Sequence, residues 1–222
     1  MRKAAAIEGV DWLRVLYCYP DETSEELLDV LAETDNICTY LDIPLQHINT
    51  ELLRRMRRRG TREDILRCVR GAKSRGLTLR TTLIVGFPGE TEDQFRELLD
   101  FVEETEFDRL GAFAYSPEEG TPAAKLPDQI TDEVKQERLD RLMTLQQEIS
   151  LRRNRMRIGS VEQVLVTDTD GNGNCLGRSS REAPEIDGEI YVSCPDARPE
   201  TGLFIPVRIT EAGEYDLRGE ML

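Results

Sequence analysis

The segment TLIVGFPGET, residues 82–91, joins a short apolar run to a glycine-containing loop that ends on an acidic residue. The apolar run predicts a buried strand, and α/β proteins bind ligands at the carboxyl ends of parallel strands. Gly86 would let the backbone approach a flat group, with Val85 and Phe87 beside it and Glu90 as a polar end. No Lys-Ser/Thr pair follows the second glycine, so this is not a Walker A loop. The alternative is an ordinary strand-to-helix turn.

Two further strand-like runs also end in polar side chains. YLDIPLQH ends with Gln46 and His47, and AFAYSPEEGT carries Tyr115 and Ser116 beyond its apolar part. Because the carboxyl ends of neighbouring parallel strands meet at one edge of a sheet, these groups should converge with residues 86–90. This convergence predicts a binding site. It identifies no catalytic acid or base, since a lone histidine is more often a hydrogen-bonded structural residue.

The segment RRMRRRGTR, residues 54–62, is the one basic cluster in the chain. Arginines near the C-terminus of a helix are favoured by the helix macrodipole and are usually solvated. The alternative is a contact with RNA phosphate or with an anionic substrate.

The chain as a whole is strongly acidic, with 43 Asp and Glu against 29 Lys and Arg in 222 residues and a net charge of -14. This balance argues against a broad nucleic-acid footprint and suits a basic protein partner. The five cysteines are widely spaced and include no C-x-x-C. They indicate unpaired thiols in a reducing cytoplasm and no metal site built from this chain alone. No apolar run approaches the ~20 residues that span a membrane.

Strand-like and helical runs alternate through the first part of the chain, which predicts an α/β fold with a parallel sheet. The strand-like runs cover residues 12–19, 40–45, 77–85 and 109–115, and a long helix follows at about 131–157. Four such units would form a small open sheet or half of a closed barrel. The opening segment MRKAAAIEG resembles the end of a helix without a cap, so we expect the downstream part of a larger domain.

Beyond Gly159 the chain changes to five short β-rich runs separated by Gly, Asn, Asp and Pro turns. This pattern predicts a small antiparallel barrel of the OB type. We therefore divide the chain into two domains, residues 1–157 and 158–222.

Four segments in this order carry a family likeness: YLDIPLQH, TLIVGFPGETEDQF, YSPEEGTPAAKLPDQI and GRSSREAPEIDGEIYV. The chain resembles the radical-SAM methylthiotransferases, and within them the branch that methylthiolates an aspartate of a small-subunit ribosomal protein. The resemblance implies half of a TIM-like radical-SAM barrel in residues 1–157. It implies an OB-like TRAM barrel in residues 158–222.

The resemblance also implies the cofactors, S-adenosylmethionine and two [4Fe-4S] clusters. The cysteine motifs that hold the clusters in this family are absent from the chain, which is therefore expected to be a C-terminal portion that is inactive alone. A partial S-adenosylmethionine site is expected at the strand ends. Its residues would be Gln46, His47, Val85, Gly86, Phe87, Glu90, Tyr115 and Ser116.

The second domain is rich in acidic residues, and four of them crowd one segment: Glu182, Glu185, Asp187 and Glu189. Such a surface should attract a basic ribosomal protein and repel tRNA. Two alternatives remain open. One is a non-catalytic module that docks on the ribosome or on RNA, and the other is a small open-sheet nucleotide-binding domain. Side-by-side order of consecutive strands would favour the half barrel over the open-sheet domain.

Overall fold

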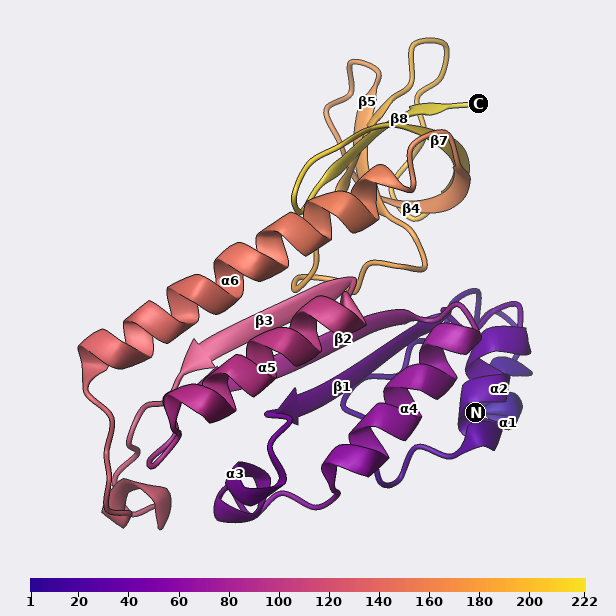
Figure 1. The fold of residues 1–222 in the computed structure, drawn as a ribbon. Helices are drawn as coiled ribbons and strands as arrows, with labels where there is room; N and C mark the ends of the chain where they lie inside the picture. The colour runs from indigo at the N-terminus through magenta and orange to yellow at the C-terminus, as the bar shows by residue number, and fades with distance from the viewer.

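The structure, a computed structural model, describes residues 1–222, which form two domains connected through one long helix (Figure 1). The helices are α1 (Arg2–Ala5), α2 (Glu25–Glu33), α3 (Thr50–Arg55), α4 (Arg62–Ser74), α5 (Glu92–Thr105) and α6 (Asp132–Arg155), with a 3-10 turn, η1 (Ala123–Lys125), before α6. The strands of the first domain are β1 (Tyr40–Gln46), β2 (Thr78–Val85) and β3 (Arg109–Ala114). No helix is both long and apolar enough to cross a bilayer.

The first domain is built on a parallel sheet in the order β1-β2-β3, so consecutive strands lie side by side. This order fits an arc of a barrel, and the α/β fold class is confirmed. Side chains alternate along each strand. Leu41 and Ile43 of β1 and Leu79 and Leu83 of β2 join the buried core under the helices. The opposite face carries Arg80, Thr82 and Phe113. Figure 1 shows α4 and α5 covering only one side of the sheet.

The segment at residues 12–19 is not the strand that its apolar character predicts. It forms one isolated bridge, between Leu13 and Ile37. Tyr17 has a φ of 62°, and its N–H donates to the Asp42 carboxylate instead of to a neighbouring backbone carbonyl. A left-handed residue interrupts an extended ladder, so the sheet has three strands instead of the expected four.

The second domain is a closed barrel with the strand order β4-β5-β6-β8-β7. Its strands are β4 (Val161–Thr169), β5 (Asn174–Arg178), β6 (Ile190–Ser193), β7 (Phe204–Ala212) and β8 (Leu217–Met221). Inward residues of all five strands form a separate buried cluster that includes Val164, Ile190, Val207 and Leu217. Closure removes the exposed edges of the sheet and confirms the predicted small barrel, although the barrel is not wholly antiparallel, because β6 pairs with β8 in parallel.

Candidate functional site

The loop after β2 is held in place by one buried carboxylate. Gly86, with a φ of 74°, donates its N–H to Oε2 of Glu90 at 2.7 Å. The same oxygen accepts from Nη1 of Arg138 on α6 at 2.6 Å. The other oxygen, Oε1, lies 3.2 Å from Nε2 of His47. Glu90 therefore connects β1, the β2–α5 loop and α6.

His47 has a structural place in this network. Its Nδ1 accepts the N–H of Asn49 at 2.9 Å, and its Nε2 lies 3.2 Å from Oε1 of Glu90 without a hydrogen bond between them. The side chains of His47 and Glu90 are both fully buried. Both residues were expected at a ligand, yet neither lines a pocket. In this structure they brace the loop from behind, and a contact with a ligand would require them to move.

The space over Gly86 is also occupied by protein. A Cβ placed on Gly86 would lie 2.4 Å from Cγ of Lys135, and one placed on Gly89 would lie 2.2 Å from Nη1 of Arg55. Gly86 is needed because the base of the Lys135 side chain and its backbone lie against it, whereas at Gly89 the Arg55 tip can move and the φ of 77° is what favours glycine. Lys135, a residue of α6, thus occupies the space over Gly86 in which a flat ligand was expected. Val85 is buried in the core and contributes its carbonyl to the N–H of Tyr115.

A pocket of about 400 Å³ opens beside this loop at the carboxyl ends of the strands. The rings of Phe87 and Tyr115 meet edge to face in its wall, with centroids 5.1 Å apart. Its other lining residues are Gln46, Arg55, Met56, Arg57, Arg58, Ile84, Thr121, Pro122, Ala123 and Leu126. Ser116 is exposed and does not line it. Half of the lining residues are hydrophobic and three are arginines, so an apolar part and a charged part adjoin in one pocket.

A second pocket, of about 340 Å³, lies on the face of the sheet that the helices leave open. Its lining residues are Tyr17, Cys18, Tyr19, Pro44, Gln46, Arg58, Arg80, Thr82 and Phe113. Gln46, which has a φ of 68°, and Arg58 line both pockets. The two cavities therefore meet at these two side chains. Arg58 and Arg80 were not among the predicted site residues, although the basic cluster that contains Arg58 was visible in the sequence.

The pocket at the strand ends fits part of S-adenosylmethionine. The aromatic and aliphatic side chains of Phe87, Tyr115 and Ile84 suit a flat base, and its volume suits a molecule of that size. The residues present do not fit an iron–sulfur cluster, which needs several thiolates at one place. All five cysteines are free, and no group of three or more His, Cys, Asp or Glu side chains comes together to hold a metal.

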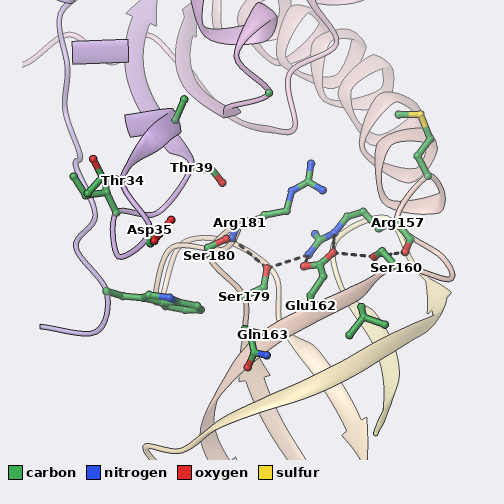
Figure 2. Close-up of a pocket in the computed structure, with 16 residues that line it drawn as sticks. Thr34, Asp35, Thr39, Arg157, Ser160, Glu162, Gln163, Ser179, Ser180 and Arg181 are labelled. Carbon is green, nitrogen blue, oxygen red and sulfur yellow. Dashed lines mark hydrogen bonds and ion pairs between the residues drawn. The ribbon is translucent and has the colours of Figure 1, made fainter. Parts of the chain in front are cut away.

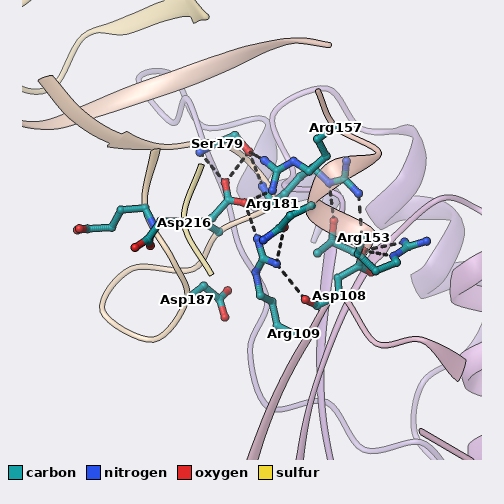
Figure 3. A network of polar contacts seen from close by, with 12 residues as sticks. Asp108, Arg109, Arg153, Arg157, Ser179, Arg181, Asp187 and Asp216 are labelled. Atoms are coloured by element: carbon teal, nitrogen blue, oxygen red, sulfur yellow. Dashed lines mark hydrogen bonds and ion pairs between the residues drawn. The ribbon is translucent and has the colours of Figure 1, made fainter. Parts of the chain in front are cut away.

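Two of the four acidic residues expected at a partner surface lie between the domains (Figure 3). Oε1 of Glu182 lies 2.5 Å from Nη1 of Arg157 and 2.9 Å from Nη2 of Arg109. Burial alone would raise the pKa of Glu182, but the two arginines lower it to about 2. Oδ2 of Asp187 accepts the hydroxyl of Tyr40 at 2.5 Å.

These contacts correct the expectation for Glu182 and Asp187, whose side chains are 1 and 2 % exposed. Both hold the barrel against the sheet and are unavailable to a partner. Glu185 and Glu189 are exposed, and their contact with a partner stays a prediction. Charge in a sequence window does not reveal such burial, because Arg109 and Arg157 come from distant elements.

The largest cleft, of about 680 Å³, lies between the two domains and away from the strand ends (Figure 2). Some of its polar side chains bond to one another, whereas those of Thr34, Asp35, Thr39, Gln163 and Ser180 do not. Arg157 donates to Glu162 at 2.9 and 2.7 Å and to Ser179 at 3.2 Å, as the dashed lines in Figure 2 show for this group. The pocket at the strand ends is the better candidate site, because α/β folds bind ligands at the carboxyl ends of parallel strands.

Comparison with known proteins agrees with this architecture. Residues 1–102 match the radical SAM superfamily, and residues 158–222 match the TRAM domain. The chain is 47% identical over its full length to the ribosomal protein uS12 methylthiotransferase RimO of Trichlorobacter lovleyi, and 48% identical to the RimO of Clostridioides difficile. It spans about half the length of these curated relatives, 50% in both cases.

A solved structure shares the fold of the first domain. Coproporphyrinogen III oxidase (HemN) from Escherichia coli, a radical SAM enzyme, superposes with a TM-score of 0.53 at 24% identity. The match covers 62% of this chain and 32% of that protein. It supports the assignment of the three-stranded arc to a radical SAM barrel.

Proposed function

We propose that this chain, which is similar over its whole length to ribosomal protein uS12 methylthiotransferases, serves in the methylthiolation of an aspartate of a small-subunit ribosomal protein. The observation that carries the proposal is the 47% identity to a ribosomal protein uS12 methylthiotransferase over all of this chain. The pocket lined by Phe87 and Tyr115 supports it, because it lies at the carboxyl ends of the parallel strands, where α/β folds bind ligands.

The residues of this chain would position and shield the cofactor. S-adenosylmethionine and iron–sulfur clusters supply the radical and sulfur chemistry of the family, and the protein supplies orientation and exclusion of water. Phe87, Tyr115 and Ile84 would hold the flat base. His47, Glu90 and Arg138 would keep the loop rigid from behind, through contacts of 3.2 and 2.6 Å to the glutamate. A braced loop loses little entropy when the ligand binds.

The second domain would attract the basic target protein. Without Glu182 and Asp187, its surface still exposes ten carboxylates and only three arginines, Arg198, Arg208 and Arg218. The exposed acidic residues are Asp168, Asp170, Glu185, Glu189, Asp196, Glu200, Glu211, Glu214, Asp216 and Glu220. A surface of this sign attracts a basic protein and repels the phosphates of tRNA.

The test is a salt series in which the whole chain binds either the basic ribosomal protein or tRNA. We expect the ribosomal protein to bind more tightly, and its affinity to fall as salt screens charges beyond ~8 Å at physiological ionic strength. Reversing two exposed charges, Glu185→Lys and Glu189→Lys, should slow association more than it speeds dissociation. Tighter binding of tRNA at every salt concentration would contradict the proposed partner and favour an RNA-docking module.

A further inference from the structure

One guanidinium group in the cleft between the domains is incompletely neutralised. Arg181 donates from Nε to the hydroxyl of Thr78 at 3.1 Å, and its Nη1 and Nη2 make no hydrogen bond. The carboxylate oxygen that pairs with it, Oδ1 of Asp108, is 3.8 Å away and already accepts two hydrogen bonds from Arg153. The Arg181 side chain is 34 % exposed. Its terminal donors are therefore accessible to a ligand.

Positive charge exceeds negative charge at the boundary between the domains, although the whole chain has a net charge of -14. Arg14 donates to two backbone carbonyl groups and Arg178 stands 5.9 Å from the centre of the Trp12 ring, so neither makes an ion pair. Burial and the charge of Arg157 hold the pKa of Arg181 below its ordinary value. The boundary holds six arginines, Arg14, Arg109, Arg153, Arg157, Arg178 and Arg181, and four carboxylates, Asp35, Asp108, Glu162 and Glu182. An anion in the cleft would relieve this excess.

The rest of the cleft supplies neutral donors and one aromatic wall. Four neutral polar side chains that make no hydrogen bond line it: Thr34, Thr39, Gln163 and Ser180. The ring of Trp12 also lines it, and an edge-to-face contact with Phe204, with centroids 4.8 Å apart, holds this ring in place. Figure 2 shows the end of the Arg181 side chain in the middle of the cleft, between Thr39 and Arg157. A volume of about 680 Å³ is in the usual range for a small-molecule site.

We propose that the cleft between the domains binds a small phosphate monoester, with the Nη donors of Arg181 on the phosphate oxygens and Trp12 beside the rest of the molecule. A phosphate monoester carries close to two negative charges at neutral pH, so it offsets the excess of arginines better than a carboxylate does. The planar fork of a guanidinium matches two phosphate oxygens. A nucleic-acid strand is disfavoured, because the surface of the barrel exposes ten carboxylates. This site is separate from the strand-end pocket, and the inference does not rest on the proposed function.

The experiment follows the fluorescence of Trp12, which is the only tryptophan of the chain and therefore reports on this cleft alone. The probes, added to the whole chain at constant ionic strength, are uridine 5′-monophosphate, uridine, and a short RNA made of uridine. Inorganic phosphate serves as a competitor. The variants are Arg181→Gln and Gln163→Glu, which adds a negative charge to the wall at an exposed residue. Arg208→Gln is the matched control, because Arg208 is exposed on the barrel outside the cleft and carries the same charge as Arg181.

We expect uridine 5′-monophosphate to bind about tenfold more tightly than uridine, as charged hydrogen bonds allow, and inorganic phosphate to displace it. This preference should be lost in Arg181→Gln, weakened in Gln163→Glu and kept in Arg208→Gln. Thermal unfolding shows whether each variant is folded, and Gln163→Glu decides the question if Arg181→Gln is not.

Four outcomes would contradict the proposal. The monophosphate could leave the fluorescence unchanged or bind no better than uridine, inorganic phosphate could fail to displace it, Arg208→Gln could lose the preference equally, or the RNA could bind more tightly than the monophosphate. None of these outcomes affects the proposed binding of the ribosomal protein, which the salt series tests separately.

Discussion

Oε1 of Glu182 lies between two guanidinium groups, 2.5 Å from Arg157 at the end of α6 and 2.9 Å from Arg109 at the start of β3. Its second oxygen accepts the N–H and the hydroxyl of Ser179 at 3.0 and 2.7 Å. One carboxylate of the barrel thus connects the long helix, the sheet and its own loop. A buried charge with all its partners satisfied fixes the orientation of the groups around it.

We predict that Glu182→Gln destabilises the chain by about 3–5 kcal/mol, because it leaves the buried Arg109 without a counter-charge and Arg157 with Glu162 alone. The difference in the free energy of unfolding between the two proteins should depend on pH. The pKa of Glu182 is about 2 in the folded chain, below the ordinary value of 4.5. Its contribution is therefore complete above about pH 4.5 and is lost as the pH falls towards 2. Urea unfolding of both proteins between pH 7 and pH 3 measures the difference.

The matched control is Glu185→Gln, which makes the same chemical change on the same loop at an exposed residue with no ion pair. Its stability should stay within about 0.5 kcal/mol of the original chain. Equal effects of the two variants, or a difference that does not shrink in acid, would show that the network around Glu182 contributes no charge-specific stability.

Much of this fold could be predicted because the pattern of each element is local. Alternating apolar residues predict β1 and β2. The Thr91 side chain accepts the N–H of Gln94 and so caps the N-terminus of α5 directly after the loop. The wrong prediction of a strand at residues 12–19 also has a physical cause. Apolar composition favoured a strand, but the left-handed Tyr17 and the Asp42 side chain end the ladder. Neither the backbone conformation of Tyr17 nor its bond to Asp42 can be inferred from the residue types of the segment.

The site was less predictable, because its contacts join residues far apart in sequence. The strand ends bring Gln46, Phe87 and Tyr115 to one pocket, which follows from the topology of a parallel sheet. Lys135, which fills the space over Gly86, comes from a helix about fifty residues later. A lysine on an amphipathic helix is normally assigned to the solvent face. Only the packing of α6 on β3 shows that this one is buried.

A second prediction concerns the hydroxyl of Tyr40, which donates to Asp187 across the domain boundary at 2.5 Å. Burial, together with the Asp187 carboxylate, raises the pKa of Tyr40 far above its ordinary value. In a double-mutant cycle, Tyr40→Phe and Asp187→Asn should show a coupling of about 1.5–3 kcal/mol, as expected for a hydrogen bond to a charged group. Thermal unfolding of the four proteins gives the coupling. Tyr40→Phe with Glu189→Gln is the control cycle, which should be additive because Glu189 is exposed.

A third prediction separates two reasons for glycine at position 86. Gly86 and Gly120 both have positive φ, 74° and 82°, but a Cβ on Gly86 meets Lys135 at 2.4 Å while one on Gly120 meets nothing within 4 Å. Gly120→Ala should therefore cost only the backbone strain, about 1–2 kcal/mol. Gly86→Ala should cost about 1–3 kcal/mol more, because overpacking adds to the strain. Denaturant titration measures both, and Lys135→Ala should recover part of the additional loss. Equal costs for the two alanine variants would contradict the role assigned to Lys135.

The last prediction concerns the five thiols. Four of them, Cys38, Cys68, Cys175 and Cys194, are buried, and Cys18 is half-buried in the wall of the open-face pocket. Burial raises the pKa of Cys68 to about 11 and, together with the neighbouring Cys194 thiol, that of Cys175 to about 12. Thiolates are the reactive form, so these buried groups should resist alkylation at pH 8. Burial and Asp42 raise the pKa of Cys18 as well, so its labelling should be slow but is possible because the side chain is partly exposed. A thiol titration should therefore find one accessible group in the folded chain and five in denaturant. Cys18→Ser should abolish the native signal, and Cys68→Ser should keep it. A ligand that occupies the open-face pocket should slow the labelling of Cys18. Rapid labelling of two or more thiols in the native chain would contradict the prediction, because it would show that the core opens more readily than its packing implies.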